Sequence, residues 1–182
     1  MLFRSNFNFL DSHDFNNALS EQKVKLFINP GMPNITWDEI LEFVNNHKQE
    51  RVGWKILPSS QAFFYNRAER IKTVNEFVRV VHSKFKLNHE DKNTLTCQLF
   101  GTILVEEGTA LEKHEDSENN LFWQCKGRSR WMIFNSYETN KPDMDIIVEE
   151  GDVLFIPSHT IHYVEPETPR ACVAILFDKE KS

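Results

Sequence analysis

His114 and Asp116 stand two residues apart in the segment GTALEKHED, residues 108–116. In an extended chain, residues i and i+2 point to the same side, so this pair can offer an imidazole and a carboxylate to one point in space. Two histidines and one carboxylate on one side of an octahedral Fe(II) ion leave three positions open for a co-substrate and dioxygen. The pair therefore supplies two ligands of such a site and predicts a third ligand from another strand.

The third ligand is expected at His162, which ends the segment GDVLFIPSHTIH, residues 151–162. A glycine turn leads into an apolar strand that ends at a proline, and the chain then reverses and presents His162 at the start of the next strand. Alone, this histidine is better explained as a half-buried structural residue. Its combination with His114 and Asp116 favours a ligand. His159, three residues earlier, is expected to point away from the metal or to line its mouth.

The spacing of His114 and Asp116 is weak evidence alone, because His89 and Asp91 repeat it. His89 lies in the polar stretch KLNHEDKNT after a helical pattern, where solvated loop residues are expected. His114 is instead followed by an apolar, aromatic run. Context therefore favours the second copy as the metal site.

Two periodicities divide the chain near residue 93. Before it, apolar residues recur at helical spacing in two segments, one beginning at Thr36 and one covering Val74 to Phe85. Thr36 with Glu39 three residues later is a capping-box pattern. A short strand over Val24–Ile28 is predicted ahead of the first of these helices.

After residue 93, about eight short β-rich runs separated by turns are predicted over residues 94–178. No helical pattern of 10–15 residues interrupts them, so the sheets should be antiparallel, as a sandwich or a barrel. The prediction is one mainly β domain of the α+β class over residues 1–182. Residues 1–93 would form a helical cover and residues 94–178 the β core.

Composition narrows the functional classes. The 182 residues carry a net charge of −6, which argues against nucleic acid as a partner, since phosphate backbones are bound by clustered Lys and Arg. No apolar run is long enough to span a membrane, and no signal-peptide core is found at the N-terminus. Three widely spaced cysteines in apolar runs indicate a reducing, cytoplasmic location. The oligomeric state is left open.

The motifs resemble a known superfamily. Gly-x5-His-x-Asp followed by Gly-x5-Pro-x4-His is similar to the two signature segments of the cupins. The stretch HEDSENNLFWQCKGRSRWMIF resembles their Jumonji-C-like branch, and HYVEPETPRACVAILF resembles the end of the prolyl-hydroxylase-like core. The matching Jumonji-C-like positions are Asn120, Gln124, Gly127, Arg128 and Arg130. The resemblance covers about residues 94–178, and residues 1–93 match no family.

The resemblance implies a double-stranded β-helix, or jelly-roll, that holds Fe(II) through His114, Asp116 and His162 and binds 2-oxoglutarate. Such a dioxygenase hydroxylates its substrate, here an unidentified small molecule or peptide, and releases succinate and CO2. Arg170 fits the prolyl-hydroxylase-like position that holds the far carboxylate of 2-oxoglutarate, and Arg130 is the second candidate.

The resemblance leaves three further points open. Arg130 lies beside the Jumonji-C-like position, where Lys is usual and this sequence has Ser129. Asn120 and Gln124 lie an even number of residues from Asp116, so both would share its inward face and could bind the cofactor or the substrate. The aromatic residues of this stretch are expected to be core.

Two alternative functions remain. A metal-dependent cupin enzyme that does not use 2-oxoglutarate would form no succinate. A metal-free cupin that serves as a binding module would be unaffected by His114→Ala.

Overall fold

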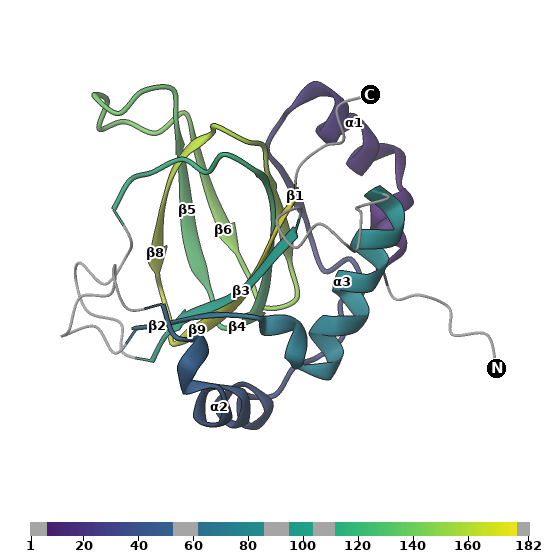
Figure 1. Cartoon of the computed structure of the whole chain (residues 1–182). Coiled ribbons are helices and arrows are strands. Elements are labelled where there is room, and N and C mark those ends of the chain that lie inside the picture. The colour runs from purple at the N-terminus through teal and green to yellow at the C-terminus, as the bar shows by residue number, and fades with distance from the viewer. Residues whose placement is uncertain (1–6, 53–61, 86–94, 104–111, 178–182) are drawn as a thin grey trace.

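The computed structural model of the chain describes residues 7–52, 62–85, 95–103 and 112–177 (Figure 1). Its helices are α1 (His13–Glu21), α2 (Trp37–Asn46) and α3 (Lys72–Phe85), with short 3-10 turns η1 (Asn8–Asp11), η2 (Lys48–Glu50) and η3 (Ala68–Arg70). Its strands are β1 (Lys25–Phe27), β2 (Ala62–Asn66), β3 (Leu95–Thr102), β4 (Asn119–Lys126), β5 (Ser129–Phe134), β6 (Met144–Val148), β7 (Val153–Ile156), β8 (Ile161–Pro166) and β9 (Arg170–Phe177).

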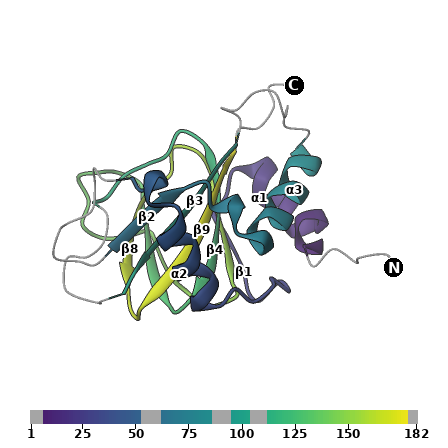
Figure 2. The same ribbon diagram turned by 60° about the horizontal axis from the view of Figure 1, so that its bottom comes forward.

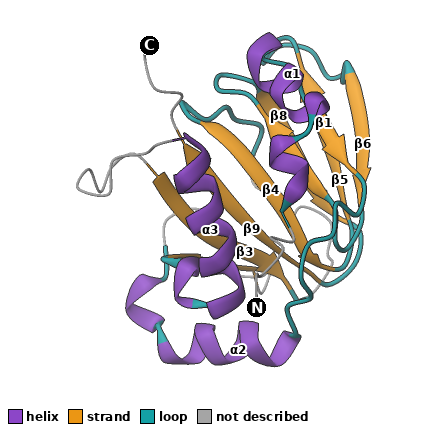
Figure 3. Ribbon diagram, turned by 90° about the vertical axis from the view of Figure 1, so that its right-hand side faces the viewer, coloured by secondary structure: helices purple, strands orange, loops and turns teal. Residues whose placement is uncertain are grey.

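The strands form two antiparallel sheets that face each other. The larger sheet has the order β1-β7-β4-β9-β3-β2, and the smaller has the order β6-β5-β8. The helices lie against the outer face of the larger sheet, so the molecule has three layers, as the turned views show (Figures 2 and 3). This arrangement is the predicted jelly-roll covered by helices.

Two apolar clusters hold these layers together. One lies between the helices and the larger sheet, where Phe77 of α3 meets Trp123 of β4 edge-on at 5.9 Å and Phe15 of α1 meets Phe155 of β7 at 5.8 Å between ring centroids. The second lies between the two sheets and includes Phe122, Trp131, Leu154, Val164 and Ala174. Strands β4, β7 and β9 are buried on both faces, and their sequences are therefore nearly continuous apolar runs.

The capping box predicted for α2 is confirmed. The Thr36 hydroxyl accepts a hydrogen bond from the Glu39 amide at 3.2 Å, and the Glu39 carboxylate accepts one from the Thr36 amide at 2.8 Å. The helix over Val74 to Phe85 is also found, beginning at Lys72. Helix α1 was not predicted, because its nine residues offer only three buried positions, Phe15, Ala18 and Leu19.

Two expectations about the β core are corrected. The described residues of the range 94–178 contain seven strands where about eight are predicted, because the described part of the run around His114 forms only a single bridge to His162. The first half of the chain is also more than a helical cover. It adds a strand to each edge of the larger sheet: β1, which is the strand predicted over residues 24–28, pairs with β7, and β2, which was not predicted, pairs with β3.

Gly127 makes the tight turn between β4 and β5 with a φ of 67°. A Cβ at this position would overlap the Pro169 carbonyl oxygen and the Thr168 hydroxyl. We therefore expect Gly127→Ala to lower the free energy of unfolding by roughly 2–4 kcal/mol, measured by urea denaturation.

The matched control for this turn is Gly151→Ala. Gly151 also has a positive φ, 94°, but a Cβ there would lie 3.5 Å from the side-chain oxygen of Asn29, an ordinary van der Waals distance. This control has the backbone strain without the overlap, so its loss of stability should be clearly smaller. Equal losses in the two variants would contradict the packing argument.

Within the described part of the chain, no helix has the length and apolar character needed to span a bilayer.

Candidate metal centre

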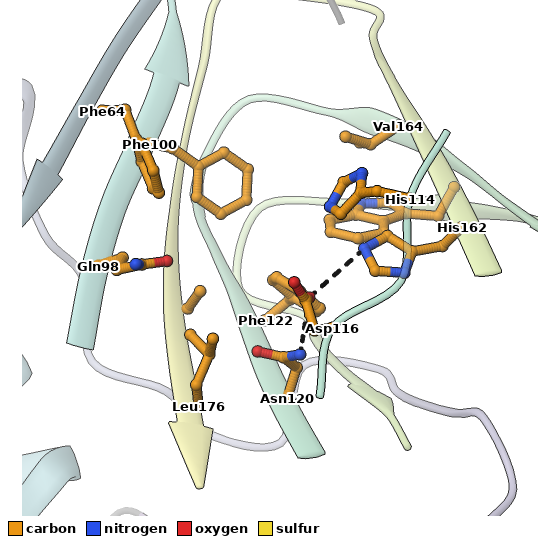
Figure 4. Close-up of a pocket in the computed structure, with 12 residues that line it drawn as sticks. Phe64, Gln98, Phe100, His114, Asp116, Asn120, Phe122, His162, Val164 and Leu176 are labelled. Carbon is orange, nitrogen blue, oxygen red and sulfur yellow. Dashed lines mark hydrogen bonds and ion pairs between the residues drawn. The ribbon is translucent and has the colours of Figure 1, made fainter. Parts of the chain in front are cut away.

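The structure brings together the three residues whose spacing suggested a metal site. His114 and Asp116 lie on the segment before β4, and His162 is the second residue of β8. One ligand atom from each lies within 4.8 Å of the others. His162 Nε2 is 3.8 Å from Asp116 Oδ2, and the two imidazole centroids are 4.4 Å apart (Figure 4). The bridge between the backbones of His114 and His162, at 3.0 and 2.8 Å, aligns the two histidines.

Hydrogen bonds set the tautomer of both histidines. His114 Nδ1 lies 2.7 Å from the Glu112 carbonyl oxygen, and His162 Nδ1 lies 2.8 Å from that of Thr160. A carbonyl oxygen only accepts, so each Nδ1 carries the proton and donates it. Both Nε2 lone pairs are then free for a metal, which is the usual arrangement of metal-binding histidines. The donor set therefore fits a divalent ion such as Fe(II).

Burial keeps the deepest ligand uncharged. His162 is only 1% exposed, and burial together with the neighbouring His114 lowers its pKa below the usual value. At neutral pH the imidazole is therefore uncharged, as metal binding requires. His114 and Asp116 are partly exposed, so the cluster is open on one side.

Two neighbours position Asp116. The Asn120 amide donates to Asp116 Oδ2 at 2.9 Å, and the backbone N–H of His159 donates to the Asp116 carbonyl oxygen at 2.7 Å. The His159 side chain is 68% exposed and lies 3.6 Å from the Glu115 carboxylate, outside the ligand cluster. This histidine therefore acts on the site through its backbone.

Lys113 anchors the ligand segment to the loop between β5 and β6. Its ammonium donates to the carbonyl oxygens of Thr139 at 2.6 Å and Tyr137 at 3.4 Å and lies 3.9 Å from the centre of the Phe134 ring. From residue 112, where its description begins, the segment forms only the bridge to His162, so these contacts help to hold the residue next to His114.

We expect Lys113→Met to weaken Fe(II) affinity about tenfold, because groups that orient metal ligands typically contribute 10–100-fold. The affinity would be measured by anaerobic competition with a chromophoric chelator. Lys141→Met, at an exposed position of the same loop, is the matched control. Unchanged affinity in a folded Lys113→Met protein would contradict this role.

The metal cluster opens into a cavity of about 170 Å³ between the two sheets. This volume lies below the range for drug-sized ligands and suits a small molecule. Trp131 and Phe122, expected to be core, both line it, and the Trp131 ring stacks on His162 at 5.8 Å. The other lining residues are Phe64, Gln98, Phe100, His114, Asp116, Asn120, His162, Val164, Ala174 and Leu176 (Figure 4).

Arg170 is a buried cation beside this cavity. It begins β9, is 4% exposed, and its guanidinium carbon lies 5.1 Å from the ring centre of Phe100. Among the described residues, its buried Nε and Nη1 have no hydrogen-bond partner. Burial lowers its pKa to about 10, which still leaves the guanidinium protonated at neutral pH. A buried cation without a counter-charge is costly, so this position is suited to an anionic ligand.

The structure places Arg130 and Gln124 away from the cavity. On β5 the inward positions are Ser129 and Trp131, so Arg130 points outward and pairs with Asp145. Gln124 is inward but deep, where its carbonyl accepts from the Ser129 hydroxyl at 2.8 Å and its amide donates to the Lys126 carbonyl at 2.7 Å. Neither residue lines the cavity, so no cofactor contact is assigned to either.

Ser129 stands at the position where Jumonji-C-like sequences usually have lysine, and its side chain is an uncharged, buried hydroxyl. His89 and Asp91, the other copy of the spacing, lie outside the described residues.

A double-stranded β-helix with two histidines and one carboxylate at its mouth is the architecture of metal-dependent cupins. The family model described as JmjC domain matches residues 80–181, more than half of the sequence. The chain belongs to the JmjC domain family. No match among curated protein sequences was found.

Solved structures with the same fold include YcfD, a ribosomal oxygenase from Escherichia coli. It is 13% identical with a TM-score of 0.66, over 92% of this chain and 52% of that chain. Its complex with cobalt and 2-oxoglutarate gives 14% identity and a TM-score of 0.64, over 94% and 53%. Its complex with cobalt and succinic acid is 13% identical with a TM-score of 0.64, and the match covers 94% of this chain and 53% of that chain. This chain thus spans about half the length of these structures.

Proposed function

We propose that this protein is an Fe(II)- and 2-oxoglutarate-dependent oxygenase that hydroxylates its substrate and releases succinate and CO2. The observation that carries the proposal is the cluster of His114, Asp116 and His162, with both Nε2 atoms free, at the mouth of a cavity. Membership of the JmjC domain family supports it. So does a fold shared with a ribosomal oxygenase that was solved with cobalt and 2-oxoglutarate.

The three ligands define which metal chemistry the site can support. Two neutral imidazoles and one carboxylate would bind Fe(II) on one side and leave the remaining positions to small molecules. When bound, Fe(II) and 2-oxoglutarate supply the activation of dioxygen, which no side chain can provide. The Asp116 carboxylate lowers the net charge of the site and favours a divalent ion. The Asn120 side chain donates to this carboxylate, and the backbone N–H of His159 donates to the backbone carbonyl oxygen of Asp116, so both residues hold Asp116 in place.

Arg170 is the proposed partner of the far carboxylate of 2-oxoglutarate. A guanidinium grips a carboxylate through two parallel N–H groups, and two of its nitrogens, Nε and Nη1, are without a partner among the described residues. Phe100 lines the cavity and contacts the Arg170 guanidinium, and with Phe122 and Trp131 it gives the cavity an aromatic wall. Exclusion of water strengthens the ion pair, because charges interact more strongly in a medium of low dielectric constant.

The proposal predicts that the purified protein converts 2-oxoglutarate to succinate only when Fe(II), ascorbate and oxygen are present. Uncoupled turnover without substrate is slow, so succinate would be quantified by mass spectrometry with 13C-labelled 2-oxoglutarate. His114→Ala should abolish the conversion, because only two ligands remain. His47→Ala, outside the cluster and the cavity, is the matched control.

Two results would favour the alternative functions. Stoichiometric iron without succinate formation would indicate a cupin enzyme that does not use 2-oxoglutarate. Metal content that does not change in His114→Ala would indicate a binding module that needs no metal.

A further inference from the structure

We propose that the substrate presents an N–H donor group, a primary amide or a cationic nitrogen group, to the amide carbonyl oxygens of Asn120 and Gln98. This inference rests on the proposed function in taking the cavity beside the metal centre as the place where substrate binds. It goes further in naming the chemistry that the cavity selects.

The orientation of the Asn120 amide is determined by its neighbours. This side chain is completely buried, and its Nδ2 donates to Asp116 Oδ2 at 2.9 Å and to the Glu118 carbonyl oxygen at 3.3 Å. Both partners only accept, so a flipped amide would place oxygen against oxygen. Asn120 Oδ1 is left buried and without a partner among the described residues, and it faces the cavity (Figure 4).

This orientation revises the role expected for Asn120. Both of its N–H groups are used, so it has no donor to offer a carboxylate of 2-oxoglutarate. Its free carbonyl oxygen would repel a carboxylate and would accept from an N–H group. A buried acceptor without a partner is unfavourable, so a ligand that supplies the missing donor gains affinity.

Gln98 presents the same chemistry from β3. Its Nε2 donates to Asn66 Oδ1 on β2 at 3.3 Å, and its Oε1 points into the cavity (Figure 4). The amide oxygens of Gln98 and Asn120 therefore line the same cavity from two strands of the larger sheet, on either side of β9.

Most of the described N–H donors that line the cavity are already engaged. Both histidines donate through Nδ1 to backbone carbonyls, and Trp131 Nε1 donates to the Ser129 hydroxyl at 2.9 Å. Both N–H groups of Asn120 are engaged, and so is one of the two on Gln98 Nε2. Lys113, next to the metal ligands, is turned to the loop carbonyls. Around Asn120 and Gln98 the described wall thus offers mainly acceptors and aromatic faces, which suit N–H groups and cations. The anionic cofactor is assigned instead to Arg170, beside Phe100.

The test is binding of blocked single residues to the protein loaded with Zn(II) and 2-oxoglutarate, measured by ligand-observed NMR. The protein loaded with Zn(II) is not expected to catalyse oxygenation, so the measurement is independent of activity. The probes are N-acetyl, N-methylamide forms of Gln, Lys and Arg, with Glu and norleucine as matched controls. Glu has the shape of Gln without its donor, and norleucine has the length of Lys without its ammonium.

We expect the Gln probe or the cationic probes to bind at least about tenfold more tightly than Glu and norleucine. Preference for Gln alone would identify an amide substrate, and preference for Lys or Arg a cationic one. Gln98→Leu should remove most of this preference, and Gln49→Leu, an exposed control, should keep it. If Gln98→Leu does not fold, Gln98→Glu retains acceptor oxygens and should strengthen binding of the cationic probes.

The proposal is overturned if Glu or norleucine binds as tightly as the donor-bearing probes, if no probe binds, or if Gln98→Leu keeps the full preference. Its failure is distinguishable from failure of the proposed function. Probe preference without any succinate formation would leave the N–H site in place and would reject the 2-oxoglutarate chemistry.

Discussion

His162→Ala is expected to lose Fe(II) affinity by at least about 100-fold, because it removes one of the three proposed ligands outright. Changes to groups that merely orient metal ligands already cost 10–100-fold. His162 is also the deepest ligand, stacked on Trp131 and bridged through its backbone to His114, so no described residue is placed to replace it. Metal content after anaerobic loading and desalting would measure the loss, with succinate formation as the second readout.

His159→Asn is the matched control for this variant. His159 has a φ of 56°, a left-handed conformation that asparagine tolerates better than most residues, and its side chain points away from the cluster. Its backbone N–H, which holds the Asp116 carbonyl, is retained. Metal content should therefore stay stoichiometric. Loss of iron in both variants, or in neither, would contradict the assignment of His162 as a ligand.

Arg170→Met is expected to weaken 2-oxoglutarate binding by about 100-fold without destabilising the protein in the absence of ligand. Truncating one partner of a buried, hydrogen-bonded charge pair costs about 2–5 kcal/mol of binding. In the free protein, however, the guanidinium is buried without a counter-charge among the described residues, so an apolar side chain of similar length should be neutral or stabilising. Calorimetric titration would measure affinity, and thermal unfolding would measure stability with and without 2-oxoglutarate.

The stability difference between wild type and Arg170→Met should depend on pH in a definite direction. Burial lowers the pKa of Arg170 to about 10 in the folded state, whereas the unfolded chain keeps the usual higher value. Below pH 9 the guanidinium is protonated in both states, so its unfavourable contribution to folding is constant between about pH 5 and 9. Only above pH 10 does the folded state release the proton, and the stability difference between wild type and Arg170→Met should then shrink.

Arg130→Met is the matched control for Arg170, since the sequence offers both as partners of the 2-oxoglutarate carboxylate. Arg130 is half exposed and paired with Asp145, so its loss should leave 2-oxoglutarate affinity within about twofold and should barely change stability. If Arg130→Met lost the affinity and Arg170→Met kept it, the assignment would be reversed.

The sequence alone was sufficient for the elements whose signals are local. Thr36 and Glu39 lie three residues apart, within reach of each other in any helix, so the capping box could be recognised without tertiary information. Period-two alternation likewise predicted that Asn120 lies on an inward face. The spacing of His114 and Asp116 and the turn before His162 identified the residues that now form one cluster, because ligand chemistry strongly limits which residue types can serve.

Tertiary structure decided how deep each inward residue lies and what it meets there. Asn120 and Gln124 lie four residues apart and face the same side of β4. Asn120 nevertheless lines the cavity, whereas Gln124 is hydrogen-bonded to Ser129 near the far end of the strand. The pairing of β4 with β7 and β9 sets this depth, and strand pairing across many residues leaves no local mark in the sequence. The unpartnered guanidinium of Arg170 and the orientation of the Asn120 amide arise in the same way, because both depend on neighbours that only the closed barrel brings together.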